Sequence, residues 1–236
     1  MKEELISIGY SFITNSDSEV LLTSFVEWGE DCLDKFNGMW AFAIWDRKNK
    51  KLFCSRDRFG IKPFYWSSYN GSIYFGSEIK QIRKLNLGKR CNYNELSLFL
   101  YSGCTDSSSN TFFEGIQSLP PGHNLTVGRD GVLNINSWYS IRNKIRIFNN
   151  PSDPDEFRYL LKNSIKLRMR SDVDICSSLS GGLDSSSIIA LISEILSDTK
   201  SSKTLTAIHA KCSERLFDES SYAEMAAKSA NCNFQL

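Results

Sequence analysis

Ser180-Gly181-Gly182-Leu183-Asp184-Ser185-Ser186 is the stretch that decides the predicted fold and function of this chain. An apolar run, Val173 to Leu179, precedes it, and a strongly helical run, Ser187 to Leu196, follows it. A strand that turns through two glycines into a helix can hold phosphate, because glycine lets the backbone approach an anion and the first-turn N–H groups point at it. The serine hydroxyls add neutral donors. The stretch therefore predicts a nucleotide site.

Asp184 adds a metal to this prediction, because a carboxylate would repel a bare phosphate unless a divalent cation lay between them. The competing interpretation is a strand–Gly–Gly–helix corner in which glycine is needed for packing alone. The loop lacks the lysine of G-x-x-x-x-G-K-[ST] and the spacing of G-x-G-x-x-G. The remaining pattern, S-G-G-x-D-S, resembles the signature of the PP-loop ATP pyrophosphatases. That family cleaves ATP between the α and β phosphates and adenylates an acyl or carbonyl oxygen.

Composition narrows the class of protein. The 236 residues suffice for one large domain or two modest ones, and the 28 basic and 27 acidic residues leave a net charge of +1. This balance indicates neither a nucleic-acid surface nor a membrane anchor, and neither a membrane-spanning run nor a signal peptide is present in the sequence. Seven cysteines without a C-x-x-C pair, beside only two histidines, argue against zinc. The scattered, odd cysteine count suits a reducing cytosol, so we expect a cytoplasmic protein.

The front half has the pattern of antiparallel strands with flanking helices. Tyr69-Asn70-Gly71 contains Asn-Gly, a strong hairpin signal. The expected strands are Met39–Trp45, Leu52–Arg56, Pro63–Ser67, Ser72–Gly76, His123–Val127 and Val132–Trp138. The expected helices are Glu19–Trp28, Glu78–Leu85 and Asn94–Tyr101.

The back half alternates between helices and strands after a polar connection at 143–153. Asp153 is a good N-cap and Pro154 suits the first helical position of a helix that runs to about Met169. The next elements are expected at Val173–Leu179 (strand), Ser185–Leu196 (helix), Thr204–Ala210 (strand) and Ser220–Cys232 (helix). This order predicts a parallel sheet with the glycine loop at the carboxyl end of its first strand, where such sheets bind ligands.

Three strings in the front half carry a family resemblance. They read FNGMWAFAIWD at 36–46, SRDRFGIKPFY at 55–65 and FGSEIK at 75–80. They are similar to the glutaminase domain of glutamine-hydrolysing asparagine synthetases, in which a PP-loop synthetase domain follows. FDESSYA at 217–223 also resembles that synthetase domain. The resemblance implies a truncated class II amidotransferase domain at 1–145, of the α+β class with antiparallel sheets. The start of an α/β parallel-sheet synthetase domain, also incomplete, is implied at 153–236.

The resemblance also implies site residues. Asp17 would bind the α-amino group of glutamine, and its competing role is a helix N-cap. Ile208 would pack against adenine, and its competing role is that of a buried strand residue; His209 is expected to be a strand-end residue and not a catalyst. Asp184 is the implied metal ligand. The implied ATP-binding residues are Leu179, Ser180, Gly181, Gly182, Leu183, Asp184, Ser185, Ser186 and Ile208.

The ends of the chain depart from the family pattern. Class II amidotransferases use an N-terminal cysteine whose α-amino group is the general base, whereas this chain begins Met1-Lys2-Glu3 and its first cysteine is Cys32. The arginine for the glutamine carboxylate and the N-G-E-x-Y string are missing as well. The chain ends at Leu236, where we expect a third synthetase strand to begin. We therefore expect an interior fragment that carries no catalytic nucleophile and does not hydrolyse glutamine.

The implied activity of the intact protein is ATP- and Mg²⁺-dependent synthesis of asparagine from aspartate and glutamine through β-aspartyl-AMP. A homodimer is left open. Three alternatives also remain: a β-lactam-synthetase-like enzyme that adenylates another acceptor, a tRNA-modifying PP-loop enzyme, and a non-catalytic remnant that binds nucleotide. The near-neutral charge and the glutaminase-like front half argue against the tRNA enzyme.

Overall fold

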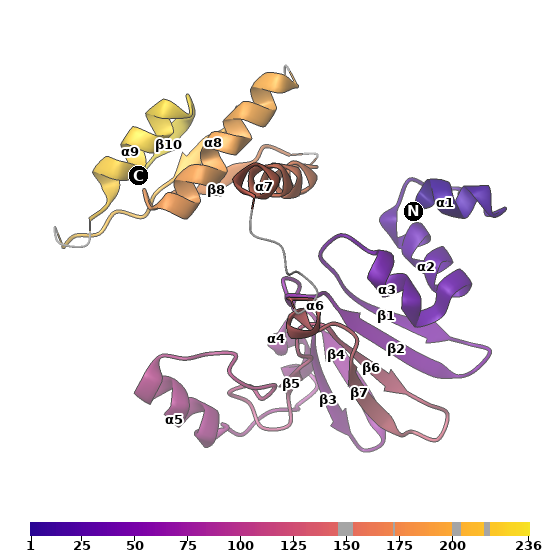
Figure 1. Ribbon diagram of the computed structural model, residues 1–236. Coiled ribbons are helices and arrows are strands. Elements are labelled where there is room, and N and C mark those ends of the chain that lie inside the picture. Colours follow the sequence, from indigo (N-terminus) through magenta and orange to yellow (C-terminus); the bar gives the residue numbers. More distant parts are fainter. Residues whose placement is uncertain (146–152, 172, 200–203, 215–217) are drawn as a thin grey trace. The chain divides into compact units, whose positions relative to one another are not determined.

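The computed structural model of the chain describes residues 1–145, 153–171, 173–199, 204–214 and 218–236. The chain divides into two compact units, unit 1 (Met1–Phe148) and unit 2 (Asn149–Leu236). Across the described ranges, no helix is both long and apolar enough to cross a membrane. Figure 1 shows the elements of each unit.

Unit 1 is built on a four-stranded antiparallel sheet with the order β1-β2-β6-β7. Its strands are β1 (Ala41–Asp46), β2 (Lys51–Arg56), β6 (His123–Val127) and β7 (Leu133–Ser137). The β1–β2 hairpin runs in register from Ala41 opposite Arg56 to Asp46 opposite Lys51. The Asp46 carboxylate closes the turn by accepting the backbone N–H groups of Lys48 and Asn49, each at 2.9 Å.

A second antiparallel sheet has the order β4-β3-β5. Its strands are β3 (Tyr65–Tyr69), β4 (Ser72–Gly76) and β5 (Gln117–Ser118). The hairpin between β3 and β4 turns through Asn70 and Gly71, at φ 49° and 71°, which is the conformation of a type I′ turn. The predicted Asn-Gly hairpin is therefore confirmed.

Helices cover one side of the β1–β2 hairpin (Figure 1). They are α1 (Lys2–Ser7), α2 (Asp17–Trp28), the 3₁₀ turn η1 (Gly29–Asp31) and α3 (Cys32–Lys35). An aromatic core joins them to the sheet: the ring of Phe25 on α2 stacks on that of Phe53 on β2 at 4.8 Å, and Cys32 and Leu33 are buried in the same cluster. This packing holds the C-terminal part of α2 on the sheet, and Asp17 lies at the other end of the helix.

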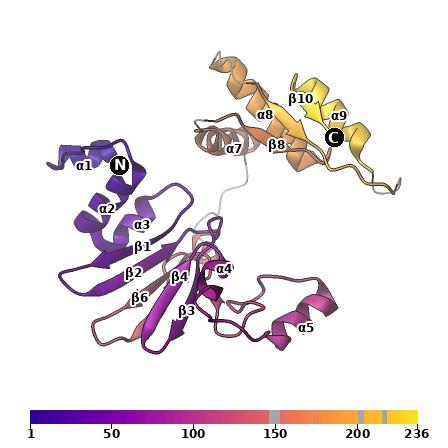
Figure 2. The same cartoon turned by 180° about the vertical axis from the view of Figure 1, so that it is seen from behind.

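The remaining helices of unit 1 are short. They are α4 (Ile79–Arg83), α5 (Tyr93–Ser102) and α6 (Ile141–Ile145). From the front and from behind, α5 stands away from both sheets (Figures 1 and 2). Its Leu100 and Tyr101 are exposed.

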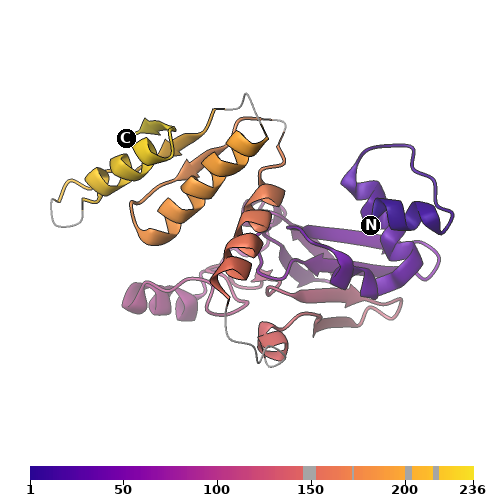
Figure 3. The same ribbon diagram turned by 45° about the horizontal axis from the view of Figure 1, so that its top comes forward.

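Unit 2 is a three-stranded parallel sheet with helices. In chain order its elements are α7 (Pro154–Arg168), β8 (Cys176–Ser178), α8 (Leu183–Asp198), β9 (Thr206–Ile208), α9 (Ser220–Ser229) and β10 (Asn233–Gln235). The strand order is β10-β9-β8, and both pairs are parallel. The helices α8 and α9 run beside each other (Figure 3).

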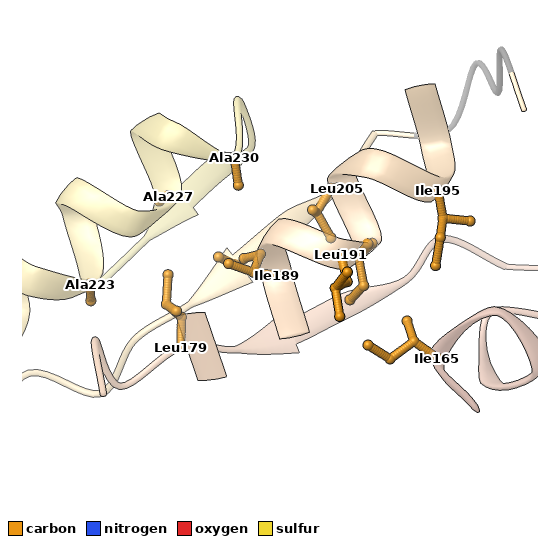
Figure 4. Packing of buried hydrophobic residues seen from close by; sticks show 11 residues of the cluster. Ile165, Leu179, Ile189, Leu191, Ile195, Leu205, Ala223, Ala227 and Ala230 are labelled. Atoms are coloured by element: carbon orange, nitrogen blue, oxygen red, sulfur yellow. The ribbon is translucent and has the colours of Figure 1, made fainter. Parts of the chain in front are cut away.

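The core of unit 2 lies between the helices and the sheet (Figure 4). Ile165 of α7 faces α8, while Ile189 and Leu191 of α8 are 1% and 6% exposed. Lys162 adds ion pairs from α7 to Glu194 and Asp198 of α8, at 2.7 and 2.8 Å. Because α8 is held on two sides, its first turn and the loop before it have a fixed base.

The predicted fold class is confirmed, with corrections at particular elements. The helix expected to run to Cys232 ends at Ser229, and the third parallel strand, expected beyond the chain, is present as β10. Asn231 has φ 49°, a left-handed conformation that turns the chain from α9 into β10. The strands β8 and β9 are shorter than expected, and α1, α3, β5 and α6 were not predicted. Phe217 of the FDESSYA string lies outside the described residues.

Candidate functional site

The glycine loop lies where the sequence predicted it, between the carboxyl end of β8 and the first turn of α8. Leu179 is 2% exposed and its N–H donates to the carbonyl of Ile208 at 2.9 Å, so the loop starts on a strand fixed in the sheet. Gly181 has φ 88°, which a residue with a side chain rarely adopts. The chain thus turns out of the sheet at Gly181 and enters α8 at Leu183.

Hydrogen bonds within the loop hold its shape. The hydroxyl of Ser185 accepts from the N–H of Ser180 at 3.2 Å, lies 3.0 Å from the hydroxyl of Ser180 and donates to the carbonyl of Gly182 at 3.2 Å. The hydroxyl of Ser180 also accepts from the N–H of Gly182. Two of the predicted serine donors are therefore bonded inside the loop, so the backbone N–H groups carry more of the predicted anion binding than the sequence indicated.

The first turn of α8 is open to an anion. Its N-cap is Gly182, which has no side chain to accept from the first-turn N–H groups. The helix is 16 residues long, so its dipole also favours a negative charge at this end. Leu183 and Asp184 are exposed here. The arrangement can bind a phosphate chain through backbone N–H groups.

Packing explains one of the two glycines. A Cβ on Gly181 would lie 2.7 Å from the backbone nitrogen of Ala223 and from the Cβ of Tyr222, at the start of α9. A Cβ on Gly182 would meet only the hydroxyl oxygen of Ser180, at 3.3 Å. Packing therefore accounts for Gly181, but not for Gly182, whose role is to leave the start of α8 uncapped.

A magnesium ion fits the donor set in one way only. Among the residues that the structure describes, no group of three or more His, Cys, Asp or Glu could hold a metal ion. Asp184 offers one exposed carboxylate beside the open N–H groups. Mg²⁺ is commonly bound by one or two carboxylates together with phosphate oxygens and water. The residues therefore fit a magnesium ion that arrives with a nucleotide.

The two residues at the end of β9 lie next to the loop. Ile208 is 47% exposed, so the competing view of it as a buried strand residue is wrong, and its predicted contact with adenine stays a prediction. His209 is 5% exposed, and its Nδ1 lies 2.7 Å from the carbonyl oxygen of Leu179. It lies at a strand end, as expected, but it is bonded to the residue that starts the loop.

Asp17 lies in unit 1, at a cavity of about 330 Å³ between α2 and β1. The N-cap of α2 is Ser16, whose hydroxyl accepts from the N–H of Ser18, so the competing role of Asp17 as N-cap is wrong. The carboxylate of Glu19 anchors the preceding loop through Thr14 and Ile13, and these hydrogen bonds lower the pKa of Glu19. The cavity is lined by Asp17, Ser18, Leu21, Met39, Trp40, Ala41, Phe42, Lys62, Pro63 and Ser77.

Asp57 holds the backbone of two residues that line this cavity, Trp40 and Lys62, and the sequence did not single it out. Its side chain is 1% exposed. One carboxylate oxygen accepts from the N–H groups of Phe59 and Ile61, at 3.1 and 3.0 Å. The other accepts from those of Trp40 and Lys62, at 3.2 and 2.9 Å. The signal that could have found it is an acidic residue directly after the expected strand Leu52–Arg56 and between two arginines.

Each of the two units matches a known protein family. Residues 1–139 match the family model described as a glutamine amidotransferase domain, and the chain belongs to that family. Residues 156–234, which contain the glycine loop, match the model described as asparagine synthase. The resemblance found in the sequence is thereby confirmed for both units.

Curated relatives carry the corresponding names. Asparagine synthetase [glutamine-hydrolyzing] 3 of Bacillus subtilis is 38% identical over 81% of this chain and 31% of its own length. Asparagine synthetase [glutamine-hydrolyzing] 1 of the same organism is 32% identical over 82% of the chain and 30% of its own length. Amidase chry2 of Gibberella zeae is 29% identical over 92% of the chain and 33% of its own length. The chain thus spans about a third of the length of these relatives.

A solved structure also aligns. It is the glutamine phosphoribosylpyrophosphate amidotransferase from B. subtilis complexed with ADP and GMP, at 14% identity and a TM-score of 0.38. The alignment covers 99% of this chain and 57% of that one.

Proposed function

We propose that this chain is part of a glutamine-hydrolysing asparagine synthetase, a carbon–nitrogen ligase that uses ATP, aspartate and glutamine. Residues 1–145 would be the glutaminase-type domain and residues 153–236 the start of the synthetase domain. The observation that carries the proposal is the S-G-G-x-D-S loop on the uncapped start of α8, inside the part that matches asparagine synthase. A cytoplasmic location fits the biosynthetic role.

The loop would bind the pyrophosphate half of ATP. Negative charge develops on the leaving pyrophosphate when an aspartate carboxylate attacks the α-phosphorus, and fixed N–H groups stabilise such charge without reorganising. The N–H groups of Leu183, Asp184 and Ser185 in the first turn of α8 are the donors for this role. The internal bonds of Ser180 and Ser185 hold the turn in place. Asp184 would hold Mg²⁺, which neutralises phosphate charge when bound.

The cavity at Asp17 would serve the ammonia-donating half. The Asp17 carboxylate is exposed beside the cavity and would bind the α-amino group of glutamine. Lys62 lies on the same cavity, on a loop whose N–H groups are held by Asp57. Ammonia released from glutamine would then displace AMP from β-aspartyl-AMP to give asparagine.

The test is pyrophosphate–ATP exchange, which reports reversible adenylation, measured on the protein that contains this chain. We expect exchange that requires aspartate and falls by a factor of about a hundred or more in Asp184→Asn. The matched control is Asp198→Asn at the other end of α8, which should retain exchange. Exchange that proceeds without aspartate would contradict the proposal, and nucleotide binding without exchange would favour a non-catalytic remnant.

A second candidate keeps the adenylation and changes the acceptor. The relative named Amidase chry2 is 29% identical over 92% of the chain, so a similar sequence occurs in a protein with another name. An enzyme of this kind, like a β-lactam synthetase, would activate a different carboxylic acid with the same loop. Exchange supported by other carboxylic acids and not by aspartate would establish it.

A further inference from the structure

His209 carries a hydrogen bond that defines its protonated nitrogen. Its Nδ1 lies 2.7 Å from the carbonyl oxygen of Leu179. A carbonyl oxygen can only accept, so Nδ1 carries the hydrogen and donates it. In the neutral ring, Nε2 is then an acceptor, and it is buried with no hydrogen-bond partner among the described residues. A polar ring with an unpartnered nitrogen is costly to bury, and the Nδ1 hydrogen bond is the polar contact that offsets this cost.

This hydrogen bond pairs the carbonyl of Leu179, at the point where the loop leaves the sheet. Leu179 donates its N–H to the carbonyl of Ile208, which continues the ladder between β8 and β9. In a regular parallel ladder the carbonyl of Leu179 would accept from the backbone of the neighbouring strand. Here the imidazole N–H of His209 takes that place. The chain can therefore leave the sheet after Leu179 and turn at Gly181 without leaving a buried carbonyl unpaired.

The same ring is fixed by its other neighbours. It stacks on Phe234 of β10, with ring centroids 6.2 Å apart, and the backbone N–H of His209 donates to the carbonyl of Gln235 at 2.9 Å. The position of the His209 ring is thus fixed by the sheet rather than by the loop.

We propose that His209 is a positioning residue of the nucleotide loop, which fixes the first loop residue through the carbonyl of Leu179 and thereby orients the N–H groups of α8 toward phosphate. The loop is then anchored on two sides, by His209 at its start and by the start of α9 against Gly181. His209 itself need not touch the nucleotide. This inference rests on the proposed function for its binding readout.

The experiment compares three variants of the full chain. His209→Phe keeps a ring against Phe234 and removes the donor, whereas His209→Asn keeps an N–H near the place of Nδ1. The matched control is His123→Phe in unit 1, because the Nδ1 of His123 also lies 2.7 Å from a carbonyl oxygen, that of Pro121. The measurements are the dissociation constant of ATP with Mg²⁺ by calorimetry and the hydrogen exchange of the amides from Leu179 to Ser185.

We expect His209→Phe to bind ATP about three- to tenfold more weakly and to exchange the loop amides faster, with His209→Asn restoring both. His123→Phe should change neither. If His209→Phe does not fold, His209→Gln replaces it, because its longer side chain moves the N–H away from Leu179. Equal behaviour of the Asn and Phe (or Gln) variants, or unchanged exchange in the Phe variant, would overturn the proposal. If the wild-type chain binds no ATP, the proposed function fails while the exchange comparison still decides the role of His209.

Discussion

Replacing Gly181 with alanine, and comparing the result with Gly182→Ala, tests the geometry of the loop with two adjacent and chemically identical changes. At Gly181 the backbone has φ 88°, and the new Cβ would lie 2.7 Å from the backbone nitrogen of Ala223 and from the Cβ of Tyr222. A strained conformation costs about 1–3 kcal/mol and overpacking costs a similar amount. We therefore expect Gly181→Ala to lower the free energy of unfolding of unit 2 by about 2–4 kcal/mol.

Gly182 differs because its backbone is extended, at φ −70° and ψ 165°, and its Cβ would meet only the hydroxyl oxygen of Ser180. Alanine is a poorer N-cap than glycine, but it also restricts the unfolded chain. These effects oppose each other, so Gly182→Ala should change the free energy of unfolding by less than about 1 kcal/mol.

The assay uses the distribution of tryptophan. All five tryptophans lie in unit 1, so their fluorescence follows unit 1 during denaturation, while far-ultraviolet circular dichroism also follows the helices of unit 2. Gly181→Ala should lower the midpoint of the dichroism transition assigned to unit 2 and leave the fluorescence midpoint unchanged. Equal loss in the two variants, or a larger loss in Gly182→Ala, would refute the reasoning.

Three further predictions concern buried and exposed groups. Asp57→Asn leaves two backbone N–H groups without an acceptor oxygen and should lower the free energy of unfolding of unit 1 by about 2 kcal/mol or more. Asp34→Asn, at an exposed carboxylate, should not. Urea unfolding measures both, and equal unfolding midpoints of the two variants would contradict this prediction. Asp184→Asn should weaken ATP binding about tenfold in the presence of Mg²⁺ and leave it unchanged when a chelator removes the metal. Titration calorimetry measures both dissociation constants. The same loss of affinity with and without Mg²⁺ would argue against metal binding at Asp184. Burial raises the pKa of Cys54 to about 12, so an alkylating reagent should label the exposed Cys104 rapidly and Cys54 only on unfolding. Mass spectrometry detects the labelled residues. Rapid labelling of Cys54 in the native protein would be inconsistent with its burial.

Local signals predicted the elements that surround the loop. Asp153 caps α7 by accepting the N–H of Asp155, and Pro154 occupies the first helical position, both as expected. The sequence also predicts the Asn70-Gly71 turn, because its left-handed φ values are accessible to these residues without large strain. Such features depend on a few neighbouring residues, and the sequence shows those directly.

Features that depend on distant residues were not predicted. The carboxylate of Asp57, just after β2, accepts from the N–H of Trp40, just before β1, and no pattern in the sequence links these two residues. The Nδ1 bond of His209 to Leu179 joins residues 30 positions apart. The strand β10 was missed although Asn231 is a recognised left-handed residue at helix ends, because the apolar pattern of α9 continues to Cys232. The competing role of Asp17 as helix N-cap is wrong because Ser16 takes that position, and both residue types cap helices.

The central claim is that the loop from Leu179 to Ser186 binds ATP through the start of α8. Hydrogen exchange of the full chain, with and without ATP and Mg²⁺, tests it most directly because it locates the bound ligand. We predict slower exchange in the amides of this loop and the first turn of α8, and no change in β1 and β2 of unit 1. Unchanged exchange in the loop at saturating ATP, or protection confined to unit 1, would contradict the claim.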